Sequence, residues 1–233
     1  SVGLGVMGFH SFLQQKRIPL ESVMSKSWNK KIFKNIHEKV NQASKDLAEE
    51  RGSCPDAAEY GFKERFSNKT AIAPTASISI ICGGTSPGVE PIAANSFTHK
   101  TLSGSFNVRN RYLEKILEKH NKNDDETWSG ITTNQGSVSH LDFLTQQEKD
   151  VFKTAFELDQ KWIVELGADR TPHVSQAQSI NIFVPADIHK KELHQIHFQA
   201  WKKGLKSLYY CRSKSIQRAE NVNDAKLTDV TAN

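Results

Sequence analysis

The chain has 233 residues, of which 37% are hydrophobic and 24% charged, with a formal net charge of +5. This is the composition of a globular protein with a substantial core. Its three cysteines, Cys54, Cys82 and Cys211, are far apart and odd in number, which excludes a disulfide framework or a zinc ribbon and favours a reducing, cytoplasmic setting.

The first predicted elements are an apolar opening, a long helix and a segment rich in small residues. The opening, SVGLGVMGF, is too short and lacks the basic residues of a signal peptide or membrane anchor. It begins without Met, so we expect the chain to be a piece of a longer protein. Residues Trp28 to Arg51 predict an amphipathic helix that ends at Gly52. Ala71 to Pro91, AIAPTASISIICGGTSPGVEP, then alternates small, hydroxyl and apolar residues.

The middle of the chain predicts helices separated by polar loops. Arg111 to His120 predicts a short helix, followed by a loop at NKNDDETWSG. Thr145 to Leu166 predicts one longer helix, because Thr145 and Glu148 have the spacing of a capping box and apolar residues recur along one face. Gly167 is expected to end this helix.

The last part of the chain predicts a parallel βαβ unit. Gln178 to Pro185 predicts a strand, Lys190 to Lys203 a helix, and residues 205–212 (LKSLYYCR) a second strand. A strand, a helix and a strand within about forty residues favour a parallel pair and hence an α/β fold. The polar residues from Ala219 onward predict a flexible tail.

A basic segment lies near the end of the chain, between Trp201 and Ala219. It contains no acidic residue and these basic ones: Lys202, Lys203, Lys206, Arg212, Lys214 and Arg218. Such a segment is able to bind nucleic acid, a phosphate or an acidic partner. A solvated basic surface is an equally good interpretation.

The APTASIS stretch has the features of an anion site. Pro74 is common near helix starts, and Thr75 and Ser77 carry hydroxyl groups. If a helix begins here, the free N–H groups of its first turn point toward one spot, and the helix dipole favours negative charge. A phosphate would then need no lysine. The alternative is a Ser/Thr-rich turn that caps its own helix.

Other candidate sites are weaker. The CGGTSPG stretch lacks the Gly-Lys-Thr ending of a phosphate-binding loop and predicts a tight turn. His194 and His197 are three residues apart on a predicted helix, but only Glu192 stands beside them, which disfavours a metal site. Cys211 beside Arg212 is only weak support for a reactive thiol.

Two tyrosines, Tyr209 and Tyr210, are adjacent in the last predicted strand. Neighbouring side chains of a strand point to opposite faces, so the two phenols are not expected to share one role. An ordinary strand is the simplest interpretation, since tyrosine is a good strand residue. A functional pair is the alternative.

Three stretches, in this order, resemble the large (α) subunit of class I ribonucleotide reductase: VGLGVMGF, APTASISIICGGTSPGVEP and QSINIF…HFQAWKKGLKSLYYCRS. The resemblance runs from Val2 to about Glu220 and corresponds to the C-terminal part of that subunit. It implies an α/β fold, namely the C-terminal half of the ten-stranded α/β barrel of ribonucleotide reductases, with additional helices. Residues 1–218 would form the C-terminal part of the catalytic barrel domain, and residues 219–233 the flexible tail.

The resemblance also implies which residues are functional. In this family a PTAS-type loop binds the phosphates of the substrate nucleotide, and adjacent tyrosines relay an oxidising equivalent from the small subunit to an active-site cysteine. The corresponding residues here are Thr75, Ala76, Ser77 and Ile78 for the loop, and Tyr209 and Tyr210 for the relay. Ile78 departs from the family, because relatives often have a hydroxyl residue there, so only its backbone N–H would serve. Two phenols in sequence are able to stack if the backbone twists locally.

The family's remaining catalytic parts are expected outside this chain. None of its three cysteines matches the radical-forming cysteine, the substrate-reducing pair or the Cys-x-x-Cys tail, so we expect no turnover by the chain alone. No cofactor is expected in this chain, and a metal-based radical cofactor is expected in the small (β) subunit. The implied partners are the N-terminal part of the α subunit, the β subunit, a ribonucleoside diphosphate and a second α subunit.

Two other classes of protein stay open. One is a cobalamin-dependent relative, in which no tyrosine relay is needed; the pair Tyr209 and Tyr210 argues against it. The other is a non-catalytic nucleic-acid-binding module that uses the basic segment 202–218, which lacks a recognisable binding motif.

Overall fold

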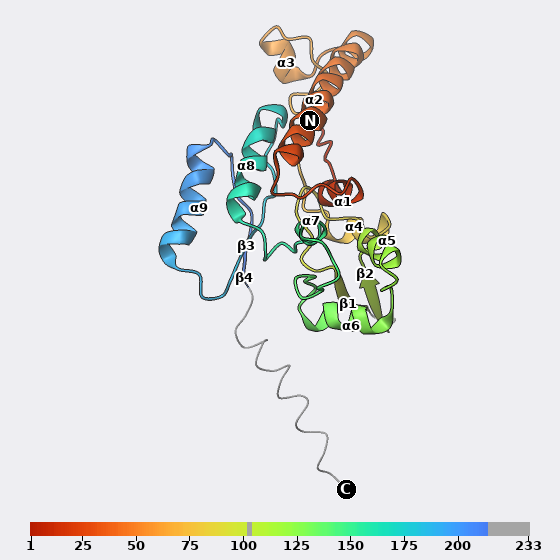
Figure 1. Ribbon diagram of the computed structural model, residues 1–233. Helices are drawn as coiled ribbons and strands as arrows, with labels where there is room; N and C mark the ends of the chain where they lie inside the picture. The colour runs from red at the N-terminus through yellow and green to blue at the C-terminus, as the bar shows by residue number, and fades with distance from the viewer. Residues whose placement is uncertain (102–103, 214–233) are drawn as a thin grey trace.

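The computed structural model describes residues 1–101 and 104–213 (Figure 1). The predicted tail from Ala219 onward lies outside these residues, as do Lys214 and Arg218 of the basic segment. Within the described residues, no helix is both long enough and apolar enough to cross a membrane.

Four extended segments that are far apart in the sequence lie side by side and run parallel, and together they form a ribbon. The parallel contacts are Leu4 with Thr70, Ile72 with Gln178, and β3 (Ile182–Val184) with β4 (Cys211–Ser213). Backbone hydrogen bonds continue between these contacts, for example from Ser179 N to Ile72 O and from Tyr209 N to Ile180 O. The order across the ribbon is therefore residues 2–4, 68–72, 176–184 and 209–213. Parallel neighbours joined by long crossovers are typical of α/β folds.

The predicted βαβ unit is confirmed, with shorter strands than expected. Helix α9 (Lys190–Lys202) connects β3 to β4. It packs against α8 (Gln160–Arg170), which in turn packs against the long helix α2 (Val23–Arg51). Figure 1 shows α8 and α9 beside the two strands.

Two other predicted helices are confirmed. Helix α2 begins five residues before the expected start, because the Ser22 side chain caps it by accepting a hydrogen bond from Ser25 N. It ends at Gly52, whose φ of 79° is a conformation that glycine adopts without strain. Helix α5 (Arg111–Lys119) lies where the short helix was predicted.

The single helix predicted for residues 145–166 is wrong. The capping box of Thr145 and Glu148 does begin a helix, α7 (Gln146–Val151), but residues 152–159 are not helical before α8 begins. In the break, Ala155 N donates to the distant Ile92 O, and Asp159 caps the new helix. A long-range contact thus interrupts a locally helical pattern.

Gly167 does not end α8, which continues to Arg170. A Cβ atom at position 167 would stand 2.7 Å from the Ile180 side chain, so the glycine allows α8 to pack closely on the ribbon. The expectation of a C-terminal stop failed because this glycine has a packing role.

Several elements were not predicted from the sequence. They are α1 (Phe9–Gln15), α3 (Pro55–Glu59), α6 (Asp125–Thr133), the antiparallel hairpin of β1 (Ser96–Thr101) and β2 (Gly104–Arg109), and the 3-10 turn η1 (Thr171–His173). Helix α6 begins inside the expected polar loop, where the Asp124 side chain accepts from Thr127 N. An Asp cap and two acidic residues in the first turn stabilise this start.

The described residues form two apolar clusters. The larger surrounds the parallel ribbon and includes Phe9, Phe33, Ile180 and Ile182. The smaller lies among α5, α6 and α7 and includes the fully buried Trp128. The ribbon is therefore buried at its centre, while its ends and their loops are available to form a site.

Candidate functional site

The PTAS-type loop begins a short helix, α4 (Ala76–Ile81). Thr75 stands before it in a left-handed conformation, with φ 52° and ψ 28°. Its side chain does not cap α4; the hydroxyl oxygen instead accepts a hydrogen bond of 2.7 Å from Gly88 N. The alternative of a turn in which Thr75 caps its own helix is therefore not observed.

The first turn of α4 is open to solvent. Ala76, Ser77 and Ile78 are exposed, and their backbone N–H groups have no acceptor within the part of the chain that the structure describes. Ser79, in contrast, is buried and donates its hydroxyl to Ala76 O. The loop thus leaves backbone donors unpaired next to the exposed Ser77 side chain.

A glycine-rich turn at residues 83–88 packs against the loop at 75–78. The backbone φ angles of Gly83 and Gly84 are 87° and 69°, which confirms the predicted tight turn. Gly88 has φ 48°, and a Cβ atom there would stand 2.9 Å from Ala73 O. This close approach lets Gly88 N reach the Thr75 hydroxyl.

Tyr209 and Tyr210 lie immediately before β4, and their rings are in contact. The ring centroids are 4.2 Å apart and the planes are tilted by 53°. Both side chains are about half exposed, at 48% and 55%. Because the pair precedes the regular strand, the two rings do not alternate between faces as strand neighbours would.

The surroundings of the two phenols are polar and charged. Hydrogen bonding to the Tyr210 phenol raises the pKa of Tyr209 above its ordinary value. The Arg212 guanidinium lies 5.7 Å from the centre of the Tyr210 ring. The Tyr210 phenol is thus close enough to influence how readily Tyr209 loses its proton.

A buried carboxylate, which the sequence did not indicate, joins the two regions. Glu90 is 6% exposed, and its two carboxylate oxygens accept hydrogen bonds of 3.0 Å from the backbone N and side-chain Nδ2 of Asn181. The Asn181 Oδ1 atom accepts from Tyr210 N, also at 3.0 Å. Burial raises the pKa of Glu90, and the two Asn181 donors oppose that shift. A polar Asn within the apolar run SINIF is the signal that was available in the sequence.

Three basic residues in the described part of the basic segment have contacts within the molecule. Lys203 forms an ion pair of 2.7 Å with Glu165. The Lys206 ammonium donates to three backbone carbonyls, at residues 174–176. The Arg212 guanidinium lies over the Tyr210 ring at cation–π distance. These contacts fix the chain around the ribbon and disfavour a surface for nucleic acid.

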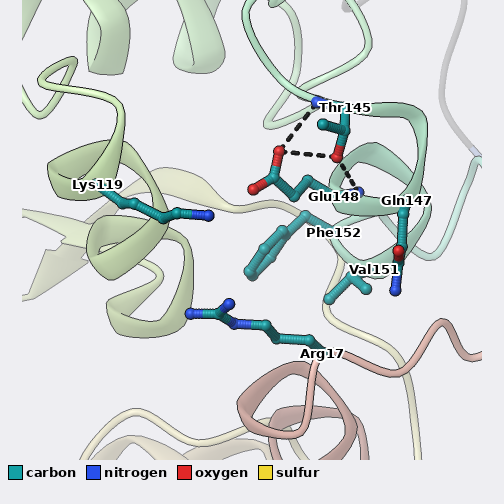
Figure 2. Close-up of a pocket in the computed structure, with 7 residues that line it drawn as sticks. All are labelled: Arg17, Lys119, Thr145, Gln147, Glu148, Val151 and Phe152. Carbon is teal, nitrogen blue, oxygen red and sulfur yellow. Dashed lines mark hydrogen bonds between the residues drawn. The ribbon is translucent and has the colours of Figure 1, made fainter.

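A separate cavity of about 250 Å³ lies near the start of α7. Figure 2 shows the Arg17 and Lys119 side chains pointing into it beside Phe152 and the capping box of Thr145 and Glu148. Neither the loop at 75–78 nor the tyrosine pair lines this cavity. It is not part of the candidate site.

Metal ligands do not gather in the described part of the chain. No group of three or more His, Cys, Asp or Glu residues there is arranged to hold a metal ion. The ring of His194 stacks on Phe198, and His197 bonds to Leu193 O of its own helix. Cys82 and Cys211 are exposed and free, and Cys54 is partly exposed and free.

The family model described as the barrel domain of ribonucleotide reductase matches residues 1–64 and 55–211. The chain belongs to the ribonucleotide reductase family. The ribonucleoside-diphosphate reductase large subunit of Invertebrate iridescent virus 6 is 49% identical over 227 residues, which cover 96% of this chain and 24% of the relative. That of Invertebrate iridescent virus 3 is 43% identical over 231 residues, covering 98% and 36%.

A solved structure agrees with this assignment. The Actinobacillus ureae class Id ribonucleotide reductase alpha subunit matches with a TM-score of 0.85 and 38% identity, over 92% of this chain and 39% of that one. The expected resemblance and the expected α/β barrel class are thereby confirmed. The chain spans 24% and 36% of the length of the two viral relatives.

Proposed function

We propose that this chain is the C-terminal portion of the catalytic subunit of a ribonucleoside-diphosphate reductase, with residues 1–218 forming part of the catalytic barrel domain. The assembled enzyme reduces ribonucleotides to 2′-deoxyribonucleotides by radical chemistry. The observation that carries the proposal is the contact between Tyr209 and Tyr210, whose ring centroids are 4.2 Å apart. In a regular strand, successive side chains point to opposite faces, so two adjacent half-exposed phenols would not be in contact.

In this proposal the start of α4 binds the substrate phosphates. The free backbone N–H groups of Ala76, Ser77 and Ile78 donate to phosphate oxygens, and the Ser77 hydroxyl adds a further hydrogen bond. Ile78 contributes only its N–H group. Thr75 stabilises the loop and does not contact the phosphate through its hydroxyl oxygen, because that oxygen already accepts a hydrogen bond from Gly88 N.

The tyrosine pair carries the oxidising equivalent toward the substrate. Oxidation of one phenol removes an electron and releases its proton, and reduction by the next phenol restores both. A neighbouring hydrogen-bonding phenol, such as Tyr210 for Tyr209, supplies a short path for that proton. The pair argues against a cobalamin-dependent relative, in which the radical arises beside the substrate.

The proposal requires partners. The radical-forming and substrate-reducing cysteines come from the N-terminal part of the α subunit, and the metal-based radical cofactor belongs to the β subunit. The intact enzyme is expected to contain two α subunits and to act in the cytoplasm.

Reconstitution tests this proposal. The chain is combined with the N-terminal part of its α subunit and with the β subunit, a dithiol is supplied as the reductant, and conversion of a ribonucleoside diphosphate is measured. We expect turnover only when all three components are present. Turnover by this chain alone, or failure of the complete mixture with correctly folded components, would contradict the proposal.

A further inference from the structure

The link between Glu90 and Asn181 has a defined direction of hydrogen bonding. Glu90 supplies acceptors to both Asn181 donors, so the Asn181 amide must turn its Nδ2 toward Glu90. Its Oδ1 then necessarily faces Tyr210 N, from which it accepts a hydrogen bond of 3.0 Å. Rotating the amide by half a turn would place a donor against the Tyr210 N–H. The carboxylate therefore sets the orientation of the group that holds the tyrosine backbone.

Glu90 is also connected to the candidate phosphate loop through hydrogen bonds. Glu90 N donates to Pro87 O and closes a turn that contains Gly88. Gly88 N donates in turn to the Thr75 hydroxyl at 2.7 Å. Four short steps thus connect Thr75, the residue before α4, to the backbone of Tyr210: the Thr75–Gly88 hydrogen bond, the turn from Gly88 to Glu90, the Glu90–Asn181 hydrogen bonds and the Asn181–Tyr210 hydrogen bond.

Both central residues are buried, so water does not replace their contacts. Glu90 is 6% exposed and Asn181 is 2% exposed. Within the described residues, no lysine, arginine or histidine nitrogen lies within 4.0 Å of the Glu90 carboxylate. A buried carboxylate is costly unless its hydrogen bonds are complete, which explains why both Asn181 donors are used. The Arg212 guanidinium adds a favourable charge interaction from beyond ion-pair distance.

We propose that Glu90 and Asn181 are positioning residues that hold Tyr210 in a fixed relation to the candidate phosphate loop. The inference rests on the proposed function and deepens it, since it names the contacts that align the radical path with the substrate. A relay between phenols depends on a constant distance between rings, and Asn181 fixes the backbone from which one ring projects.

Exchanging the acid and the amide provides a test. Glu90→Gln places a second amide against the Asn181 donors, so one donor must lose its partner whichever way either amide turns. Asn181→Asp places a carboxylate against Glu90. The double variant, Glu90→Gln with Asn181→Asp, restores every hydrogen bond, because the amide now at position 90 donates to the carboxylate now at position 181, which still accepts from Tyr210 N. It also keeps the net charge of the protein.

The readout independent of activity is hydrogen exchange of the Tyr210 amide in the assembled reductase. The Tyr209 amide, which donates to the backbone at Ile180 O, is the internal control. We expect Glu90→Gln to speed exchange at Tyr210 by about tenfold or more relative to Tyr209, because the Asn181 amide loses its fixed orientation. Asn181→Asp should have the same effect because repulsion between the two buried carboxylates displaces the side chain at 181 from Tyr210 N, and the double variant should return toward the wild-type rate. Equal acceleration of both amides, or no recovery in the double variant, would overturn the inference.

Turnover is measured on the same proteins, with Tyr210→Phe as the reference for a broken relay. We expect turnover to fall about tenfold or more in each single variant, with the Michaelis constant for the nucleoside diphosphate changing less, and to recover in the double variant. Normal turnover in both single variants while Tyr210→Phe is inactive overturns the positioning role alone. Normal turnover in Tyr210→Phe as well contradicts the proposed function.

Discussion

The rings of Tyr209 and Tyr210 are in contact although their residues are adjacent in an extended chain. Just before β4, Tyr209 N donates a hydrogen bond to the backbone at Ile180 O, whereas Tyr210 N donates to the Asn181 side chain. Because Tyr210 N bonds to a side chain and not to a neighbouring backbone carbonyl, the chain departs from regular strand geometry at this residue. The two rings then share one face.

The candidate phosphate loop gives the first prediction. Ser77→Ala should weaken binding of the nucleoside diphosphate to the reconstituted enzyme by about 1–2 kcal/mol, the scale of one hydrogen bond to a charged group. The melting temperature should stay unchanged, because the Ser77 side chain is exposed. A substrate titration measures the effect, and unchanged affinity would remove Ser77 from the site.

Thr75 should behave differently, because its hydroxyl oxygen is bonded to Gly88 N. Thr75→Val keeps the shape but leaves that N–H without its acceptor, so we expect a loss of about 1–3 kcal/mol in unfolding free energy as well as weaker binding. Thr75→Ser keeps the oxygen and serves as the control. Urea unfolding of both variants checks the prediction, and equal stability would show that the contact with Gly88 contributes nothing.

A second stability prediction concerns Gly136, at which φ is 81°. A Cβ atom there would stand 2.6 Å from Ala94 Cα, and the Gly136 carbonyl accepts two hydrogen bonds from Asn95. Gly136→Ala should therefore lower the unfolding free energy by about 3 kcal/mol or more. Gly204→Ala is the matched control, because its φ is 77° but a Cβ atom would meet nothing within 4 Å. It should cost about 1 kcal/mol, and similar losses in the two variants would be the contrary result.

Burial of His10 gives a pH prediction. His10 is 1% exposed and its Nδ1 accepts from Ile92 N; burial lowers its pKa from 6.5 to about 3. The folded state then binds this proton less readily than the unfolded state. The associated stability is complete above pH 6.5 and is lost as the pH falls toward 3.

The expected size of this effect is about 2 kcal/mol of unfolding free energy between about pH 7.5 and about pH 5. His10→Asn retains an acceptor near the Nδ1 position but does not titrate, so the variant should lack this part of the pH dependence. Urea unfolding of both proteins at the two pH values measures the difference. Parallel pH curves would contradict the assignment of a neutral, buried His10.

Local signals in the sequence predicted local structure well. The periodic apolar residues of α2 and the capping box at Thr145 each depend on residues within one or two helical turns, and both are present in the structure. The apolar periodicity wrongly predicted a helix across residues 152–159, where Ala155 N donates a hydrogen bond to the distant Ile92 O. No local pattern contains that contact.

The candidate site combines local and distant residues. The roles of the loop at 75–78 and of the tyrosine pair stay predictions, each made from a short contiguous motif with a family resemblance. Glu90 and Asn181 were missed, because they are 91 residues apart and meet only when the ribbon forms. Their partnership follows from parallel pairing of distant segments, which single-sequence patterns do not specify.

The central claim is that Tyr209 and Tyr210 relay an oxidising equivalent. Replacing either with Phe keeps the ring and its packing but removes the phenolic proton, so stability should change by at most about 1 kcal/mol. Substrate affinity should be unchanged, because the candidate phosphate loop is intact. Tyr60→Phe, at a tyrosine that is 72% exposed and remote in sequence, is the matched control.

Turnover of the reconstituted enzyme is the decisive measurement. Tyr209→Phe and Tyr210→Phe should each lower turnover by orders of magnitude, since phenylalanine is far harder to oxidise and a relay in series fails at any broken step. The control Tyr60→Phe should retain wild-type turnover. Normal turnover in Tyr209→Phe or Tyr210→Phe, with folding and substrate binding intact, would contradict a role for that residue in the radical path.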